Sequence, residues 1–325
     1  MIAVAADKSE ILLAGPLRPV IAKGLAGFTV QELAVAANHD ALIAAAGHVG
    51  ALAVTTMARI DDAMLARLPN LEIIASFGVG YDHVDAKAAA KRGVVVTNTP
   101  DVLTEEVADT AIGLLLCTVR ELPQAERHVR AGKWLECNYP LSRATLRNRT
   151  VGLVGMGRIG LAIARRLEPF GVSIVYHTRQ PRPDLAYRHY PQLINMARDA
   201  DTLIVIVPGG ATTRNMIDAK VLEALGPDGI LINVARGSVV DEAALIAALR
   251  ERKIMAAGLD VFVKEPEVPE ALLNMENVVL LPHVGSASVF TREKMDQLVV
   301  DNILAWAAGR PPLTPVPETP WRAWR

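Results

Sequence analysis

Three glycines between a short apolar run and a helix-like segment place the strongest constraint on this chain. The run Val151–Val154 precedes the sequence GMGRIG at residues 155–160, and apolar residues then recur every four positions up to Leu167. A strand, a G-x-G-x-x-G turn and a helix in this order are typical of proteins that bind a dinucleotide at the helix N-terminus. We therefore predict a parallel α/β sheet with a dinucleotide at this turn.

Each glycine of the turn has its own expected role. Gly155 allows the tight turn, Gly157 lets the backbone approach a pyrophosphate, and Gly160 lets the helix pack closely on the sheet. The helix N-terminus adds unpaired N–H groups and the positive end of its dipole. The alternative is that the glycines serve only a tight turn in an α/β core. The residues predicted to contact the cofactor here are Gly155, Met156, Gly157, Arg158, Ile159 and Gly160.

Short apolar runs alternate with helix-like segments along almost the whole chain, which predicts two doubly wound parallel sheets covered by helices. A single hydrophobic core stops growing at about 250–300 residues. A chain of 325 residues is therefore expected to form two domains. The first series of predicted strands is Ile2–Ala5, Ala51–Thr55, Leu71–Phe77 and Val94–Val96, with a helix at Asp61–Leu68. The second series has six strands: Val151–Val154, Val172–Tyr176, Thr202–Val207, Ile230–Val234, Ala257–Val261 and Val278–Leu281.

Two long helices are predicted outside these strands. Residues 103–120 carry Glu105 and Glu106 in the first turn, where the helix dipole favours negative charge, and are expected to form a hinge helix between the domains. Residues 291–308 have apolar side chains at helical spacing and are expected to cross back to the first domain. The proline-rich tail that contains Trp321 and Trp324 is predicted to be an extended arm.

The residues after the second strand of the cofactor sheet predict which dinucleotide binds. An Asp or Glu at this position would accept hydrogen bonds from the ribose hydroxyls of NAD, but the chain has Thr178, Arg179 and Gln180. A hydroxyl and a guanidinium suit a 2'-phosphate, with Arg182 close enough in sequence to assist. We therefore predict a preference for NADPH, with NADH also possible. The alternative is that Arg179 is an ordinary solvated loop residue.

Three residues that follow successive predicted strands suggest a reaction. Arg236, Glu265 and His283 would meet, because the carboxyl ends of parallel strands face the same crevice. In the reduction of a 2-keto acid, His283 would protonate the carbonyl oxygen and Arg236 would hold the carboxylate and the keto oxygen. Glu265 would orient the imidazole and favour its charged form. Asp260 is expected to accept a hydrogen bond from the nicotinamide amide.

Taken one at a time, these residues also have structural interpretations. His283 follows Pro282 and would be a structural histidine, Glu265 would form a plain turn with Pro266, and Arg236 would make a surface ion pair. Their joint occurrence at strand ends after a dinucleotide turn favours the catalytic interpretation.

Four ordered segments resemble the D-isomer-specific 2-hydroxyacid dehydrogenase family, in particular its glyoxylate and hydroxypyruvate reductase branch, which includes proteins similar to 2-ketogluconate reductase. The segments read VGLVGMGRIGLAIA, NVARGSVVDEAALIAAL, AAGLDVFVKEP and LPHVGSAS, and SFGVGYDHVD and NTPDVLTEEVADTAIGLLL precede them. The resemblance implies that Arg236, Glu265 and His283 are the catalytic group, and that 2-keto and 2-hydroxy acids are the substrates.

The resemblance also implies how the rest of the chain is used. Residues 1–99 and 288–325 would form a flavodoxin-like substrate domain and residues 100–287 a Rossmann cofactor domain, with a cleft between them. The loop Gly78-Val79-Gly80 would bind the substrate carboxylate through backbone N–H groups of Val79 and Gly80. A homodimer joined through the cofactor domains is implied, with the segment around Trp134 reaching into the neighbouring subunit. The remaining residues expected to border the cofactor are Thr104, Val207, Pro208, Thr213, Val234, Ala235, Asp260 and Gly285.

The sequence departs from the family pattern at two places. The NAD-using members carry an acidic residue where this chain has Thr178, which supports NADP. The loop after the third cofactor strand reads PGGATT where many members have Leu-Thr-Pro, which affects the contacts expected around Gly209 and Gly210.

Composition excludes several other classes of protein. A net charge of −1 leaves no broad basic field for nucleic acid, and no apolar run approaches the about 20 residues of a membrane span. The two cysteines, Cys117 and Cys137, are too few for a disulfide framework or a zinc site, so no metal and a reducing cytoplasm are expected.

Two other functions remain open at this level. The same fold resembles transcriptional co-repressors that sense nicotinamide dinucleotides, and it resembles dehydrogenases of formate or phosphite. If His283 is not the proton donor, Asp82 and His83 in the sequence GVGYDHVD are the next candidates.

Overall fold

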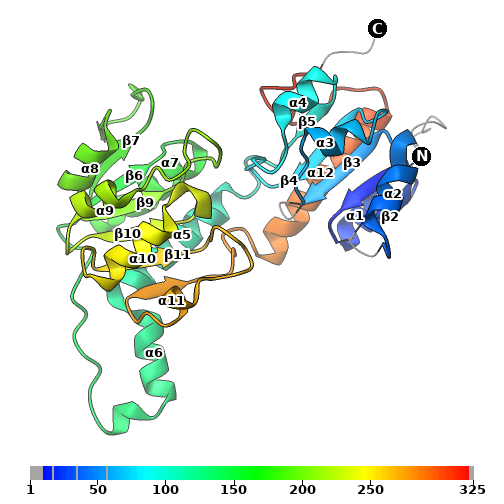
Figure 1. The fold of residues 1–325 in the computed structure, drawn as a ribbon. Coiled ribbons are helices and arrows are strands. Elements are labelled where there is room, and N and C mark those ends of the chain that lie inside the picture. The colour runs from blue at the N-terminus through cyan, green and yellow to red at the C-terminus, as the bar shows by residue number, and fades with distance from the viewer. Residues whose placement is uncertain (1–9, 17, 34–35, 56–57, 322–325) are drawn as a thin grey trace. The chain divides into compact units, whose positions relative to one another are not determined.

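A computed structural model of the chain describes residues 10–16, 18–33, 36–55 and 58–321. It divides into two compact units, shown in Figure 1. Unit 1 comprises Met1–Leu103 and Ser288–Arg325, and unit 2 comprises Thr104–Ala287. Each unit is an α/β fold with its own hydrophobic core.

Unit 1 contains a parallel sheet whose described strands follow the order β2-β1-β3-β4-β5. This is the strand order 2-1-3-4-5 of flavodoxin-like folds, which confirms the predicted fold class. The long helix α12 packs against α1 and β4, as expected for a helix that returns to the first domain. The elements are β1 (Glu10–Ala14), α1 (Pro19–Gly24), β2 (Thr29–Glu32), α2 (His39–Ala45), η3 (Ala46–His48), β3 (Ala51–Thr55), α3 (Asp62–Ala66), β4 (Ile73–Phe77), α4 (Ala86–Lys91), β5 (Val95–Thr97) and α12 (Val289–Ala307).

The first two strands of unit 1 were not recognised in the sequence. The predicted strand Ile2–Ala5 lies outside the described residues, and the first described strand is β1. β2 was missed because its sequence, TVQE, contains one strongly apolar residue and is not fully buried. The tail is non-helical up to Trp321, as predicted, and Trp324 lies outside the described residues.

Unit 2 contains a seven-stranded parallel sheet in the order β12-β11-β10-β9-β6-β7-β8. The order β8-β7-β6-β9-β10-β11 is that of a Rossmann fold, and β12 extends it by one strand. The elements are α5 (Thr104–Arg120), α6 (Leu122–Arg130), η4 (Lys133–Leu135), β6 (Thr150–Val154), α7 (Arg158–Leu167), η5 (Glu168–Phe170), β7 (Ser173–His177), β8 (Arg188–His189), α8 (Leu193–Asp199), β9 (Thr202–Val205), α9 (Ala219–Leu225), β10 (Ile230–Asn233), η6 (Gly237–Val239), α10 (Glu242–Arg250), β11 (Ala256–Leu259), α11 (Glu270–Leu273) and β12 (Val278–Leu280).

The prediction of six strands for this sheet was therefore wrong by one. β8 consists only of Arg188 and His189, so it has no apolar run and no alternating pattern that sequence analysis would detect. It nevertheless pairs with β7 through Val175 and Tyr176 and forms the edge of the sheet.

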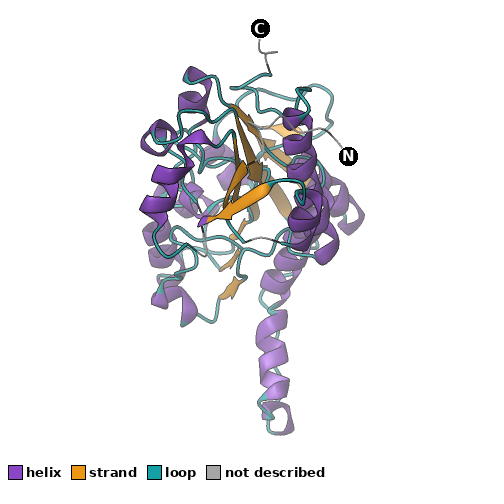
Figure 2. Cartoon of the chain, turned by 90° about the vertical axis from the view of Figure 1, so that its right-hand side faces the viewer, coloured by secondary structure: helices purple, strands orange, loops and turns teal. Residues whose placement is uncertain are grey.

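The segment from α6 to residue 144 extends away from the sheet of unit 2. Figure 1 shows α6 beyond the strands of unit 2, and the same helix projects from this unit in Figure 2. No residue of α6 is buried, and several apolar side chains of the segment are exposed. These are Leu122, Val129, Trp134, Leu135 and Leu141.

Among the described residues, none of the helices is both long enough and apolar enough to cross a lipid bilayer.

Candidate active site

The glycine turn joins β6 to α7 at the point where the strand order of unit 2 reverses. Gly155 has φ of 108°, and a Cβ on it would lie 2.6 Å from the carbonyl oxygen of Ile206. A Cβ on Gly160 would lie 2.4 Å from the carbonyl oxygen of Gly155. Both positions therefore need glycine for reasons internal to the fold.

Gly157 is different, because a Cβ on it would meet no described atom within 4 Å. Its φ of −77° is also open to any residue. No side chain caps the N-terminus of α7, so the first-turn N–H groups face outward from the helix end. Space beside Gly157 together with uncapped N–H groups fits a pyrophosphate that approaches the backbone, as the sequence predicts. Met156, Arg158 and Ile159 complete the turn.

Thr178, Arg179 and Gln180 follow β7 directly, as predicted. The Thr178 hydroxyl donates to the Gln180 carbonyl oxygen at 2.6 Å, and the His189 Nε2 lies 2.9 Å from the Thr178 carbonyl oxygen. Arg179 is exposed, and its guanidinium makes no ion pair with another described residue. The loop is therefore held by its backbone, while the Arg179 charge is available to a ligand.

Arg182 was predicted to assist in binding a 2'-phosphate, but its side chain is engaged by other groups of the chain. Its Nε and Nη2 atoms bind the Asp184 carboxylate at 3.1 and 2.5 Å, and its Nη1 donates to the Met156 carbonyl oxygen at 3.0 Å. The Arg182 N–H donates to the Tyr176 hydroxyl at 2.8 Å. Arg182 thus links the loop after β7 to the glycine turn.

The loop after β9 borders the glycine turn and is closed by Thr213. The Thr213 hydroxyl donates to the Pro208 carbonyl oxygen at 2.7 Å, and the Thr213 N–H donates to the Gly210 carbonyl oxygen at 3.2 Å. Gly210 has φ of 134°, a conformation that favours glycine. The Cγ1 of Val207 lies 3.0 Å from the position that a Cβ of Gly155 would take. Val207 therefore lies beside the predicted dinucleotide turn, and Pro208 and Thr213 belong to the same loop.

Thr104 is the first residue of α5, which packs against α7. Arg166 of α7 connects the two helices through ion pairs with Glu105 at 2.7 Å and Asp109 at 2.6 Å. The start of α5 is thereby fixed relative to the helix that follows the glycine turn.

Asn233 shapes the segment after β10 that carries Arg236. Its side chain accepts a hydrogen bond from the Ala235 N–H and donates one to the Arg236 carbonyl oxygen, both at 3.0 Å. Val234 and Ala235 are buried, whereas Arg236 is half-buried. A Cβ on Gly237 would lie 2.0 Å from the Phe262 carbonyl carbon, so the Arg236 segment packs directly on the loop after β11.

His283 and Glu265 form a direct pair. The His283 Nδ1 lies 2.6 Å from the Glu265 Oε2, and the Glu265 Oε1 accepts a hydrogen bond from the Phe262 N–H at 3.0 Å. His283 has φ of 54°, a backbone conformation that few side chains other than Asn, Asp and His adopt. Its side chain is 35% exposed, so the ring is held on one side and accessible on the other.

The pKa of Glu265 lies below its ordinary value. Burial acts to raise the pKa of this carboxyl, but hydrogen bonds from His283 and Phe262 and the charges of His283 and Arg236 outweigh burial. Glu265 is therefore ionised near neutral pH and accepts a hydrogen bond from His283 Nδ1–H. Consequently Nε2 is the imidazole atom that remains to face a substrate.

Asp260 anchors the His283 segment. The two carboxylate oxygens accept hydrogen bonds from the Val284 N–H at 2.7 Å and the Gly285 N–H at 2.8 Å, and the Asp260 carbonyl oxygen accepts from the His283 N–H at 2.9 Å. Burial raises the pKa of Asp260, against the lowering effect of these N–H donors. The sequence-based expectation was a contact with nicotinamide, whereas the described contacts of this carboxylate are with the backbone that carries His283.

Gly78, Val79 and Gly80 follow β4 in unit 1. Gly78 has φ of 136°; its N–H donates to the Thr99 hydroxyl at 3.0 Å, and its carbonyl oxygen accepts from the Thr99 N–H at 2.9 Å. The Asn98 Nδ2 donates to the Val79 carbonyl oxygen at 2.9 Å. Asn98 and Thr99 were not predicted as functional residues, although two polar residues shortly after the predicted strand Val94–Val96 were an available signal.

The fallback proton donors also lie in unit 1. The His83 Nε2 lies 3.2 Å from the Ser76 hydroxyl, and its carbonyl oxygen accepts from the Ile60 N–H at 2.8 Å. Asp82 precedes it in the same turn.

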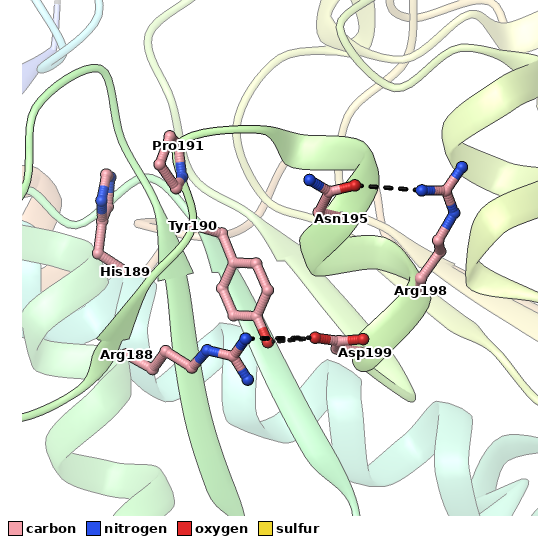
Figure 3. A pocket seen from close by; sticks show the side chains of 7 residues that line it. All are labelled: Arg188, His189, Tyr190, Pro191, Asn195, Arg198 and Asp199. Carbon is pink, nitrogen blue, oxygen red and sulfur yellow. Dashed lines mark hydrogen bonds and ion pairs between the residues drawn. The ribbon is translucent and has the colours of Figure 1, made fainter.

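An open pocket of about 410 Å³ lies at the sheet edge of unit 2, beside β8 and α8 (Figure 3). Its Tyr190 hydroxyl donates to Asp199 at 2.6 Å, and Arg188 lies over the Tyr190 ring at 4.4 Å. None of the predicted catalytic or cofactor residues lines it. Across the described residues, no group of three or more His, Cys, Asp or Glu side chains is placed to hold a metal ion.

Comparison with known proteins gives the same assignment as these local features. A family profile described as D-isomer specific 2-hydroxyacid dehydrogenase, NAD binding domain, matches residues 112–285, more than half of the chain. Glyoxylate/hydroxypyruvate reductase A of Arabidopsis thaliana is 49% identical over 79% of this chain and 82% of its own length. The 2-ketogluconate reductase of Gluconobacter oxydans is 40% identical over 95% of this chain and 99% of its own length.

A solved structure agrees over nearly the full length. The NADPH-dependent glyoxylate/hydroxypyruvate reductase of Sinorhizobium meliloti, in complex with NADP and malonate, has a TM-score of 0.92 and 54% sequence identity. The match covers 98% of this chain and 99% of that chain. The chain therefore belongs to the D-isomer-specific 2-hydroxyacid dehydrogenase family.

Proposed function

We propose that this protein is an NADPH-preferring reductase that converts small 2-keto acids to D-2-hydroxy acids. The observation that carries the proposal is the His283–Glu265 pair at 2.6 Å, next to Asp260, whose carboxylate fixes the His283 backbone. An imidazole oriented by a carboxylate, with an accessible Nε2, is the arrangement that a general acid requires. It occurs in the same unit as a glycine turn suited to a dinucleotide.

In this proposal NADPH supplies a hydride to the carbonyl carbon of the keto acid. As the C=O π electrons move to oxygen, His283 gives that oxygen a proton from Nε2 and becomes neutral. Glu265 accepts the hydrogen bond from Nδ1–H and thereby orients the imidazole, so that Nε2 is the atom that faces the substrate. Arg236 holds the substrate carboxylate and polarises the keto oxygen with its fixed positive charge. The N–H groups of Val79 and Gly80 are the proposed additional donors to the carboxylate.

The preference for NADPH is proposed from the loop after β7. Arg179 is exposed with no ion-pair partner among the described residues, and no acidic side chain occupies the position of Thr178. A guanidinium binds a 2'-phosphate in a two-pronged manner, and no carboxylate from Thr178–Gln180 repels it. The proposed cofactor residues on other elements are Thr104, the turn 155–160, Val207, Pro208, Thr213, Val234, Ala235, Arg236, Asp260, His283 and Gly285.

The substrate class is proposed from the names of the relatives and from the positive charge of Arg236. Their names include glyoxylate, hydroxypyruvate and 2-ketogluconate, which share a carboxylate next to a keto or aldehyde carbon. One arginine, one proton donor and backbone N–H groups suit this shared part of the molecules. They do not depend on the length of the carbon chain beyond it.

A homodimer is proposed from the exposed arm of unit 2, which we define as residues 122–144. Leu135 and Leu141 are each 95% exposed, and Trp134 is 64% exposed. Grouped apolar side chains of this kind mark an interaction surface, and a second copy of the chain is the proposed occupant. Both cysteines are free thiols, which fits the proposed cytoplasmic location.

The test is an assay of the purified protein with NADPH and with NADH against glyoxylate, hydroxypyruvate, pyruvate and 2-ketogluconate. Loss of nicotinamide absorbance with at least one keto acid, faster with NADPH, is the expected result. Absence of turnover with every keto acid would remove the proposal. Tight NADPH binding without turnover would then favour a nicotinamide-sensing binding protein instead.

A further inference from the structure

We propose that the C-terminal segment positions the substrate-binding loop through a tail link, defined as Asn98, Thr314 and Asn302. This inference rests on the proposed function, because it takes Val79 and Gly80 as donors to the substrate carboxylate. Within that function it assigns Asn98 and Thr314 as positioning residues. It also gives the proline-rich tail a role in substrate affinity.

The loop end of the tail link is the Asn98 side chain. Its Nδ2 donates to the Val79 carbonyl oxygen at 2.9 Å. In a trans peptide the C=O and N–H groups point in opposite directions. A fixed Val79 carbonyl therefore directs the Gly80 N–H away from Asn98. Neither the Val79 nor the Gly80 N–H donates to another group in the part of the chain that the structure describes.

The tail end of the link is Thr314, which holds the Asn98 backbone from both sides. The Thr314 hydroxyl donates to the Asn98 carbonyl oxygen at 2.6 Å, and the Asn98 N–H donates to the Thr314 carbonyl oxygen at 3.3 Å. Next to this pair, Thr97 and Pro315 form an antiparallel bridge. The tail thus runs beside the end of β5, the strand that leads to Asn98.

Asn302 of α12 fixes Thr314 in turn. It is fully buried, and its Oδ1 accepts from the Leu313 N–H at 2.9 Å and from the Thr314 N–H at 3.1 Å. Its Nδ2 donates to the Thr314 hydroxyl at 3.0 Å and to the Leu298 carbonyl oxygen at 2.7 Å. The Thr314 hydroxyl therefore accepts from Asn302 and donates to Asn98. A hydroxyl has only one proton to donate, and here that proton points to the Asn98 carbonyl oxygen. Asn302 and Asn98 together therefore fix the orientation of the Thr314 hydroxyl.

A neighbouring contact of the same kind offers a matched control. The Thr319 hydroxyl, also in the tail and buried, accepts from the Val96 N–H at 2.8 Å and lies 3.3 Å from the Val96 carbonyl oxygen. Thr314 and Thr319 thus both anchor the tail to the β5 region through a hydroxyl. Thr314 contacts Asn98, whose side chain binds the substrate loop at Val79. Thr319 contacts Val96, whose apolar side chain cannot form such a hydrogen bond.

The experiment compares Thr314→Val, Thr314→Ser, Thr319→Val and Asn98→Ala with the wild type. For each full-length protein, KM and kcat for hydroxypyruvate, KM for NADPH and the unfolding temperature are measured. Thr314→Val and Asn98→Ala should raise KM for hydroxypyruvate about tenfold, the effect of weakening one hydrogen bond to a charged group. Their kcat should stay within about twofold, as expected when ground-state and transition-state binding are lost together. Thr314→Ser keeps the hydroxyl, so its KM for hydroxypyruvate should equal that of the wild type.

Thr319→Val should lower the unfolding temperature as much as Thr314→Val but leave KM for hydroxypyruvate unchanged. Equal KM changes in the two valine variants, or no change in Thr314→Val, would overturn the tail link. If Thr314→Val does not fold, Asn98→Ala tests the same link from the loop side.

The dissociation constant of oxalate, measured by calorimetry in the presence of NADP, separates this inference from the proposed function. If the wild type binds oxalate but reduces no keto acid, the proposed function fails. Weaker oxalate binding by Thr314→Val and Asn98→Ala, but not by Thr319→Val, would still support the tail link. If the wild type does not bind oxalate and reduces no keto acid, both are overturned.

Discussion

The Nη1 of Arg182 donates to the carbonyl oxygen of Met156 at 3.0 Å, so an arginine in the loop after β7 supports the backbone of the glycine turn. Asp184 holds the other side of the same guanidinium. Arg179, three residues earlier, is exposed and has no ion-pair partner among the described residues. Two nearby arginines therefore have separate roles, one structural and one available to a ligand.

Arg179→Ala should weaken the binding of NADPH more than the binding of NADH. Loss of a charge-assisted contact with the 2'-phosphate is expected to raise KM for NADPH at least about tenfold. NADH has no such phosphate, so its KM should change little. The measurement is KM for both cofactors at saturating hydroxypyruvate.

Arg182→Ala is the matched comparison for that variant. Since Arg182 supports the turn that both cofactors would use, its loss should raise both KM values by similar factors. Equal effects of Arg179→Ala on NADPH and NADH would show that Arg179 does not contact the 2'-phosphate.

Gly157→Ala should impair cofactor binding without destabilising the protein. A Cβ at this position meets no described atom, so the free energy of unfolding should change by no more than about 0.5 kcal/mol. It would occupy the space proposed for the pyrophosphate and raise KM for both cofactors at least about tenfold.

Gly160→Ala is the control for this effect. Its Cβ would lie 2.4 Å from the Gly155 carbonyl oxygen, so overpacking should cost about 1–3 kcal/mol of stability. Normal cofactor affinity in a stable Gly157→Ala protein would contradict the proposed pyrophosphate site.

Much of this organisation could be predicted because it depends on local patterns. The glycine turn and the strands on either side are contiguous in sequence, and each buried parallel strand is a short apolar run. β8 escaped detection because two polar residues carry no such pattern. Residues of the tail link were also missed, since Asn98 and Thr314 are 216 positions apart and meet only in the folded chain.

One contact of the candidate site was predicted in the same way. Glu265 and His283 lie at strand ends, and their contact follows from the geometry of a parallel sheet. Asp260 and Arg182 were identified, but the groups that they contact were not. Their partners are backbone atoms of other loops, and sequence patterns do not specify loop geometry.

Glu265→Gln should change how stability depends on pH. The pKa of Glu265 is lower in the folded chain than its ordinary value, so the unfolded chain binds a proton at higher pH than the folded chain does. The resulting stabilisation is fully present above the unfolded pKa, about 4.3, and is lost as pH falls through the folded pKa. The unfolding temperature of the wild type should therefore fall more steeply than that of Glu265→Gln between about pH 6 and about pH 3. If the unfolding temperatures of the two proteins fall in parallel with pH, the charge on Glu265 does not stabilise the folded chain.

Leu135→Asp should disrupt the proposed dimer. Leu135 is 95% exposed in the single chain, so a charge there costs the isolated protein little. In an apolar interface, the same charge would be buried without a partner. Light scattering after size-exclusion chromatography should show a dimer for the wild type and a monomer for the variant. Lys133→Asp tests whether any added acid in η4 has this effect, and a monomeric wild type would reject the proposal.

In the proposed reaction, His283 protonates the keto acid during its reduction by NADPH. The most direct measurement is kcat for hydroxypyruvate with saturating NADPH, in the wild type and in His283→Ala. The wild type should turn over, and the variant should lose at least about a hundredfold in kcat, the lower range for a general acid. The variant should still bind NADPH, because the other proposed cofactor residues are unchanged. A His283→Ala enzyme that folds normally and keeps its kcat would rule out His283 as the proton donor and leave Asp82 and His83 as the candidates.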